Sequence, residues 1–231
     1  MRILTVGDSY TDHHEVVSLN LPHFKIWPEL ISERFELLLY NKAVCGMGNY
    51  FIFNTLLDTL TSVNKFDLAV VMWTDIKRVD EEFGFHDKEF FRTKYHNYGY
   101  DHSRFIARTK VASRLFYLTN ILSQKFNIPI IQCSGCGNVH HSILDSLYFD
   151  LIDTKHIIGW PFCRNLNGKI MSDEFEQDEI FGDVSDINDS WIVDGKLVEY
   201  DRHPNEKGHQ KMAQIIGDFL LEKNLVVDPS K

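Results

Sequence analysis

The order of apolar and polar positions predicts alternating strands and helices. Short apolar runs of strand type are separated by longer stretches in which apolar residues recur at helical spacing. The predicted strands cover Arg2 to Val6, Ala43 to Cys45, Asp67 to Trp73 and Ile128 to Cys133. The third run is continuously apolar after its first residue, as expected for a strand that is buried on both faces. The alternation is typical of a parallel sheet with helices on both faces.

Four stretches predict helices. Their apolar positions are Trp27, Leu30, Ile31, Phe35 and Leu38; Ile52, Leu56 and Leu60; several positions within 103–125; and Met212, Ile215, Ile216, Phe219 and Leu220. Pro28 marks the start of the first helix, and Asn205 is the expected N-cap of the last. We therefore expect one α/β domain over residues 1–231, with a parallel sheet of about five strands.

Two long segments, at about 76–102 and 139–200, interrupt this alternation. Connections in a compact domain are usually much shorter, so both segments are interpreted as insertions that act as lids or contact the substrate. The first is rich in aromatic side chains, whose faces suit stacking against a sugar.

Composition narrows the classes of partner and compartment. The formal charge is -9, with 33 acidic and 24 basic residues, which argues against nucleic acid or an anionic membrane as a partner. The first apolar run is too short for a signal peptide or a membrane span. Four cysteines are too few to staple a domain of this size, so we expect reduced thiols and a cytoplasmic location.

Candidate chemistry follows the predicted strands, because open parallel sheets bind ligands beyond the carboxyl ends of their strands. Ser9 follows the first strand, Gly46 follows the second, and Thr74 follows the third. A serine hydroxyl is a weak nucleophile until a base takes its proton. Acyl transfer also needs hydrogen-bond donors for the developing oxyanion, for which we consider the amides of Ser9 and Gly46 and a side chain at position 74.

His203 is the histidine best suited to act as that base. It stands in EYDRHPNEKGH, where a proline and a predicted helix start make its setting rigid. Asp201, two residues earlier, is placed to orient the imidazole ring. A polar helix-capping turn explains the same residues without any catalysis, and the motif alone does not separate the two interpretations.

Taken together, three blocks resemble the SGNH (GDSL-type) hydrolases. VGDSY is similar to the family block whose serine is nucleophile and oxyanion donor, which points to Ser9. NKAVCGMGN is similar to the block whose glycine donates its amide, and Gly46 is the best match. DRHPNEKGH resembles the last block, where a histidine before proline is the base and a nearby aspartate orients it, which points to His203 and Asp201. The resemblance implies a three-layer αβα sandwich with a flavodoxin-like parallel sheet.

The chain departs from the family pattern at two positions. Thr74 stands where the third block usually has an asparagine that completes the oxyanion hole. Three alternatives stay open: the shorter threonine hydroxyl substitutes, the hole relies on two amides, or the activity is weak. In the last block Tyr200 occupies the usual aspartate position, and Asp201 lies one residue closer to the histidine.

The sequence therefore predicts a serine esterase that removes a small, acetyl-type acyl group from an ester, with a carbohydrate as the candidate alcohol. No metal or organic cofactor is expected. Two alternatives stay open: a binding module for a carbohydrate or other ligand that keeps the fold without the chemistry, and a flavodoxin-like protein whose first loop binds a cofactor phosphate.

Overall fold

The fold is built on a parallel sheet of four strands in the order β2-β1-β3-β4. The computed structural model describes residues 1–13, 23–62, 65–78, 102–180, 192–193, 196–197 and 203–229. The strands are β1 (Arg2–Val6), β2 (Leu38–Asn41), β3 (Leu68–Trp73) and β4 (Ile130–Ser134). Their carboxyl ends lie at one edge of the sheet because all pairs are parallel, for example Thr5 with Asn41 and Val70.

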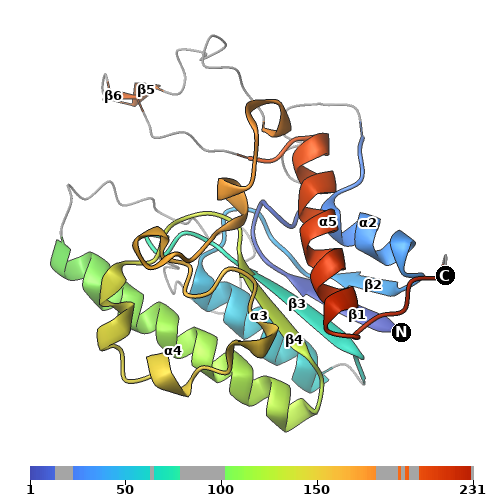
Figure 1. Ribbon diagram of the computed structural model, residues 1–231, viewed down its shortest axis with the longest axis horizontal. Coiled ribbons are helices and arrows are strands. Elements are labelled where there is room, and N and C mark those ends of the chain that lie inside the picture. Colours follow the sequence, from blue (N-terminus) through green and yellow to red (C-terminus); the bar gives the residue numbers. More distant parts are fainter. Residues whose placement is uncertain are drawn as a thin grey trace.

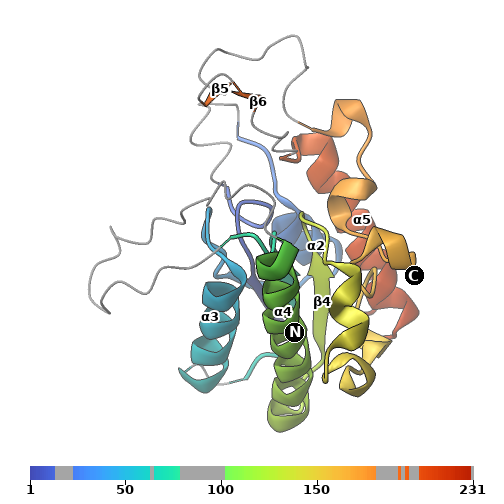
Figure 2. The ribbon, with the colours of Figure 1, turned by 90° about the vertical axis from the view of Figure 1, so that its left-hand side faces the viewer.

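Helices cover both faces of the sheet and make a three-layer αβα sandwich (Figures 1 and 2). The helices α2 (Trp27–Arg34) and α5 (Glu206–Glu222) lie on one face, and α3 (Asn49–Ser62) and α4 (His102–Phe126) lie on the other. The sheet has one hydrophobic core on each face, and alternate residues of each central strand point into one or the other. Leu4 packs with α3 and α4, while Ile3 packs with α2 and α5. This two-sided burial explains why every residue of β3 is apolar and buried.

The predicted position of the second strand was wrong. Helix α2 ends at Arg34, Glu36 adopts a left-handed φ of 52°, and the strand begins at Leu38, which pairs with Arg2. The apolar spacing places Leu38 on the helix, but it is an edge-strand residue that is 54% exposed. The apolar run Ala43 to Cys45 is a loop.

In the residues that the structure describes, the sheet has four strands, where about five are expected. Beyond β4, a single parallel bridge joins Gln132 to Ile157, and the Ile158 amide donates to the Gln132 carbonyl at 2.9 Å. A fifth segment therefore meets the edge of β4 without becoming a strand in the described part of the chain.

Residues 139–180 of the second predicted insertion pack onto the sandwich. Six short 3-10 helices run through it: η1 (His141–Asp145), η2 (Phe149–Leu151), η3 (Thr154–His156), η4 (Arg164–Leu166), η5 (Met171–Asp173) and η6 (Gln177–Glu179). They contact α4, β4 and finally α5. Further along the same predicted insertion, β5 (Ile192–Val193) pairs with β6 (Lys196–Leu197). Most of the first insertion, 79–101, lies outside the described residues, so the lid role of both segments stays a prediction.

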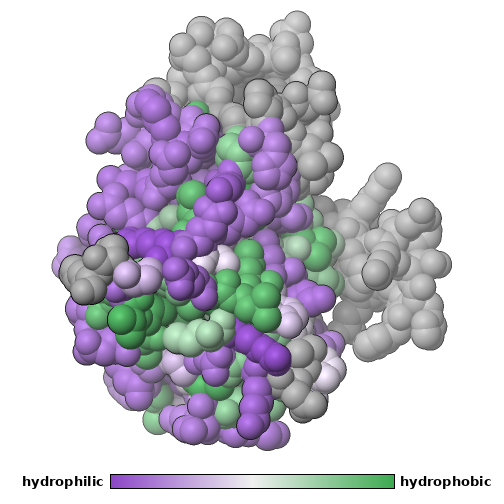
Figure 3. All heavy atoms as spheres, turned by 90° about the vertical axis from the view of Figure 1, so that its right-hand side faces the viewer, coloured by the Kyte–Doolittle hydropathy of each residue, from purple (hydrophilic) through white to green (hydrophobic). Residues whose placement is uncertain are grey.

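The surface carries apolar residues among hydrophilic ones, as Figure 3 shows for the face on the right-hand side of Figure 1. None of the helices described is long and apolar enough to cross a membrane.

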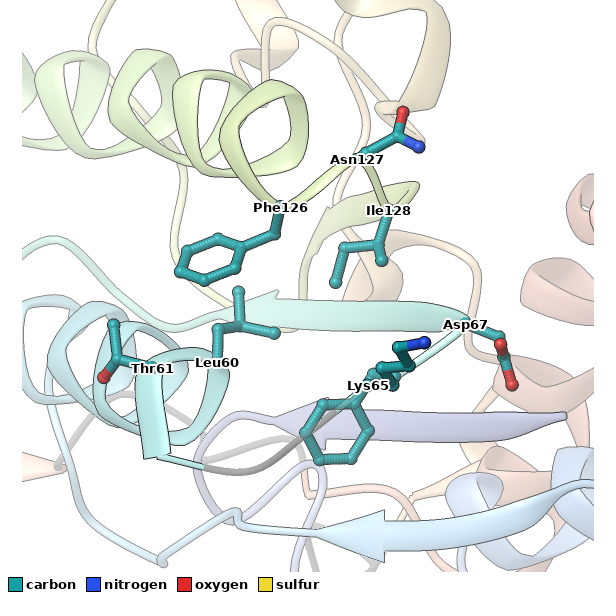
Figure 4. A pocket seen from close by; sticks show the side chains of 8 residues that line it. Leu60, Thr61, Lys65, Asp67, Phe126, Asn127 and Ile128 are labelled. Carbon is teal, nitrogen blue, oxygen red and sulfur yellow. The ribbon is translucent and has the colours of Figure 1, made fainter.

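A pocket of about 480 Å³ opens between the ends of α3 and α4 (Figure 4). Leu60, Phe126 and Ile128 form its apolar part, and Lys65 and Asp67 lie beside it. It lies where β3 and β4 begin, at the edge of the sheet opposite to Ser9. The pocket is therefore separate from the candidate site at the carboxyl ends of the strands.

Trp27 ties the start of α5 to the rest of the sandwich. Its backbone N–H donates to Nδ1 of His209 at 3.3 Å, and its indole Nε1 donates to the Tyr10 carbonyl at 2.9 Å. His209 is buried, and that burial, aided by the nearby histidines His13 and His203, lowers its pKa to about 3. His209 is therefore neutral at physiological pH.

Burial of a neutral His209 makes stability depend on pH. Below about pH 6.5 the unfolded chain binds a proton that the folded protein does not. The free energy of unfolding therefore decreases as the pH is lowered, by up to about 1.4 kcal/mol per pH unit. The change His209→Asn keeps an acceptor for the Trp27 amide and removes this titration. We expect the free energy of unfolding, measured with urea, to decrease from about pH 7 to about pH 5 in both proteins. The decrease should be larger in the wild type than in the variant by about 1–2 kcal/mol. Equal losses would contradict this account.

Candidate active site

A tight turn after β1 presents Ser9. A side chain at Gly7 would collide with Thr11 and lie 3.2 Å from the Met72 carbonyl, so only glycine fits there. The next residues close a turn in which the Thr11 amide donates to the Asp8 carbonyl at 2.9 Å and the Tyr10 amide to Asp8 Oδ1 at 3.1 Å. The turn places Ser9 at the carboxyl end of the sheet, 2% exposed.

The Asp8 carboxylate beneath this turn is completely buried. Two groups that follow β3 compensate it: Arg78 Nη1 lies 2.7 Å from Asp8 Oδ2, and the Thr74 hydroxyl donates to the same oxygen at 2.5 Å. A buried charge without such partners costs several kcal/mol. The network therefore fixes the Ser9 turn against the end of β3.

The side chain of Cys136 contacts that of Thr74. Its Sγ lies 3.6 Å from Thr74 Oγ1. Burial, and after it the negative charge of Asp8, raises the pKa of Cys136 to about 12. The side chain is therefore a thiol at neutral pH and lacks the thiolate that a nucleophilic or redox cysteine needs.

His203 reaches Ser9 from the far end of the chain. Its Nε2 lies 2.7 Å from Ser9 Oγ, across 194 residues of sequence. Both side chains are buried, with His203 7% exposed, and the Tyr10 ring lies against the imidazole at a centroid distance of 5.5 Å. With its proton on Nδ1, the ring accepts from the serine hydroxyl through Nε2, as a base that activates a nucleophile must. Asp201 lies outside the described residues, and its orienting role stays a prediction.

The loop after β2 lies beside the Ser9 turn. The Val44 amide donates to the Gly7 carbonyl at 3.1 Å, and the Cys45 amide donates to Asp12 Oδ2 at 3.1 Å. Gly46 follows with a φ of 79°, and nothing lies within 4 Å of where its Cβ would be. Backbone conformation, rather than lack of space, therefore favours glycine at this position.

The predicted oxyanion donors differ in their hydrogen bonds. The Ser9 amide donates to no group in the part of the chain that the structure describes. The Thr74 hydroxyl has one hydrogen, and this hydrogen is directed at Asp8. The parts assigned to Ser9, Gly46 and Thr74 in oxyanion binding stay predictions.

Sequence reasoning missed two residues that build the site, Asn49 and Arg78. The Asn49 side chain accepts from the Thr74 amide at 2.8 Å and donates to the Thr74 carbonyl at 2.9 Å, which fixes the backbone at the end of β3. Arg78 compensates Asp8. The available signals were an asparagine directly after Gly48, and a basic residue soon after the most apolar strand.

An aromatic side chain from the second insertion borders this region. Phe175 stacks on Tyr10 with ring centroids 6.3 Å apart and an interplanar angle of 18°, and it is only partly buried. A partly exposed aromatic face therefore lies one ring away from His203.

Comparison with known proteins finds distant structural similarity. No family model and no curated protein matches the sequence. One similar solved structure, assigned to a lipolytic G-D-S-L family, comes from Desulfitobacterium hafniense DCB-2. It has 10% identity and a TM-score of 0.48, and the match covers 95% of this chain and 99% of that one. An acetyl xylan esterase has 15% identity and a TM-score of 0.47 over 94% and 98% of the chains. A Slackia heliotrinireducens protein assigned as an SGNH hydrolase has 12% identity and a TM-score of 0.40 over 95% and 98%. At these values the case for function depends on the site geometry.

The hydrogen bond from Thr74 to Asp8 has a measurable consequence. The change Thr74→Val removes the donor and leaves Arg78 on Asp8, so we expect the free energy of unfolding to fall by about 1–3 kcal/mol. Hydrolysis of an aryl acetate should fall by less than about tenfold, whereas loss of a true oxyanion donor costs about 10²–10³-fold in kcat. The change Thr119→Val, at a buried threonine on α4, is the control. A 10²-fold or larger loss in kcat, specific to Thr74→Val, would show that the hydroxyl binds the oxyanion.

Proposed function

We propose that this chain is a serine ester hydrolase of the SGNH type, with Ser9 as nucleophile and His203 as base. The observation that supports this best is the 2.7 Å contact between Ser9 Oγ and His203 Nε2 in a buried setting at the carboxyl end of the sheet. Parallel α/β sheets bind ligands at this edge.

The proposed reaction has two halves. Ser9 Oγ attacks the acyl carbon while His203 Nε2 takes its proton, and the carbonyl oxygen becomes an oxyanion. The intermediate collapses to an acyl-serine as His203 returns the proton to the leaving alcohol. Water then attacks the acyl-serine with His203 again as base, which releases the acid and restores Ser9.

Two backbone amides are proposed to bind the oxyanion. The Ser9 amide is without a partner in the described chain, and the loop bonds of Val44 and Cys45 hold Gly46 beside the same turn. Preorganised donors of this kind are typically worth about 3–4 kcal/mol each. Asp201 is proposed to orient His203 through Nδ1.

The proposed substrate is a small acyl ester of a carbohydrate. Ser9 is almost fully buried, which favours a short acyl group. The partly exposed ring of Phe175 is proposed as a stacking face for a sugar on the alcohol side.

The nucleophile and base are tested by turnover. We expect Ser9→Ala and His203→Ala each to lower kcat for an aryl acetate by about 10³-fold or more, with the thermal midpoint of unfolding little changed, because each member of such a pair is needed for attack. A matched variant is Ser142→Ala, at a buried serine on η1 that lies outside the site. Wild-type levels of hydrolysis by Ser9→Ala would overturn the proposal. If the wild type hydrolyses no ester and Ser9→Ala binds a glycan with the affinity of the wild type, the result favours a binding module.

The carbohydrate preference is tested at Phe175. The change Phe175→Ala should raise KM for an acetylated oligosaccharide by about tenfold, the loss of roughly one stacking contact. KM for a small aryl acetate should stay within about twofold, because that ester is too small to need the distant ring. The change Phe149→Ala, at a partly buried aromatic residue on η2, is the control. Release of acetate from aryl esters but from no acetylated glycan would contradict the preference.

A further inference from the structure

The turn that carries His203 is bound to residues 178–180 of the second predicted insertion. Ile180 and Pro204 form an antiparallel bridge, and the Asn205 amide donates to the Glu179 carbonyl at 3.0 Å. Two segments more than 20 residues apart in sequence thus lie side by side directly next to His203.

The Asn205 side chain has two separate tasks. Its Oδ1 accepts from the Gly208 amide at 3.2 Å, which is the ordinary N-cap of α5. Its Nδ2 donates to the carbonyls of Asp178 at 2.8 Å and of Ile180 at 3.1 Å. A cap needs only the acceptor, and serine or aspartate would supply it equally well. The two donated bonds therefore need a different explanation.

Gly208 shows how closely the two segments approach. A Cβ at this position would collide with the Glu179 carbonyl and lie 2.7 Å from Pro204 Cβ. Glycine lowers the stability of a helix by about 1 kcal/mol relative to alanine. Its presence inside the first turn of α5 is explained by the close contact with residue 179.

We propose that Asn205 is a positioning residue for the Ser9–His203 pair. Its side-chain amide binds residues 178–180, and this contact holds the 203–205 turn in the position where His203 Nε2 contacts Ser9 Oγ. Misplacement of a catalytic group by about 1 Å can cost about 10²-fold in rate. The inference rests on the proposed esterase function, and it assigns part of the second insertion to the support of the base.

The variant Asn205→Asp separates the two tasks. Aspartate keeps the acceptor for the Gly208 amide but removes both N–H donors and places a carboxylate against two carbonyls. We expect kcat for an aryl acetate to fall by about tenfold or more with KM within about twofold, because positioning affects the chemical step. Lys207→Ala is the matched control, since it removes only the exposed ion pair of Lys207 with Asp178, and it should leave kcat unchanged.

The variant Gly208→Ala reaches the same contact without altering Asn205. Helix propensity alone would make it neutral or stabilising. If residues 178–180 support the base, the added methyl pushes them away, and kcat falls while the protein stays folded. This second variant also decides the matter if Asn205→Asp folds poorly.

A readout that is independent of turnover accompanies both variants: the rate at which an aryl fluorophosphonate labels Ser9, mapped by mass spectrometry, with thermal unfolding measured in parallel. Slower labelling in folded Asn205→Asp and Gly208→Ala supports the proposal. Wild-type labelling rates and kcat in either folded variant overturn it and leave the esterase proposal intact. Absence of labelling in the wild type overturns both.

Discussion

The site is organised by one buried charge. Asp8 has no solvent exposure, and a carboxylate in that position must be compensated by groups that are themselves fixed. Arg78 and the Thr74 hydroxyl come from the end of β3, and the Tyr10 amide comes from the same turn as Asp8. This requirement joins the Ser9 turn to the centre of the sheet. It also explains why the hydroxyl hydrogen of Thr74 is directed inward, at Asp8.

The base approaches from a second, separately anchored part of the chain. Helix α5 is tied to α2 through the Trp27 bond to His209, and its N-terminal turn is bound to residues 178–180 through Asn205. The short distance between Ser9 and His203 is thus a joint product of both ends of the chain. The apolar layers bring these ends together, and the polar contacts determine their final placement.

Much of this was readable from the sequence, and the omissions share one cause. Periodicity identified the central strands and the helices α3, α4 and α5. Two motifs pointed to Ser9 and His203, whose side chains lie in contact in the fold. Strand β2 was misplaced because the apolar spacing continues from Phe35 to Leu38 through a left-handed residue, Glu36, that no local pattern reveals. Arg78, Asn49 and the second task of Asn205 depend on partners 70, 25 and 27 residues away. Such contacts have no period, so they emerge only from the assembled fold.

The central claim is that Ser9 carries the acyl group during the reaction. The most direct measurement is mass spectrometry of the protein quenched in acid while it turns over an aryl acetate. The account predicts an acetyl group on the peptide that contains Ser9, and no such adduct in His203→Ala. Turnover with the acetyl group on another residue, or with no acyl-enzyme at Ser9 even when deacylation is slowed, would contradict it.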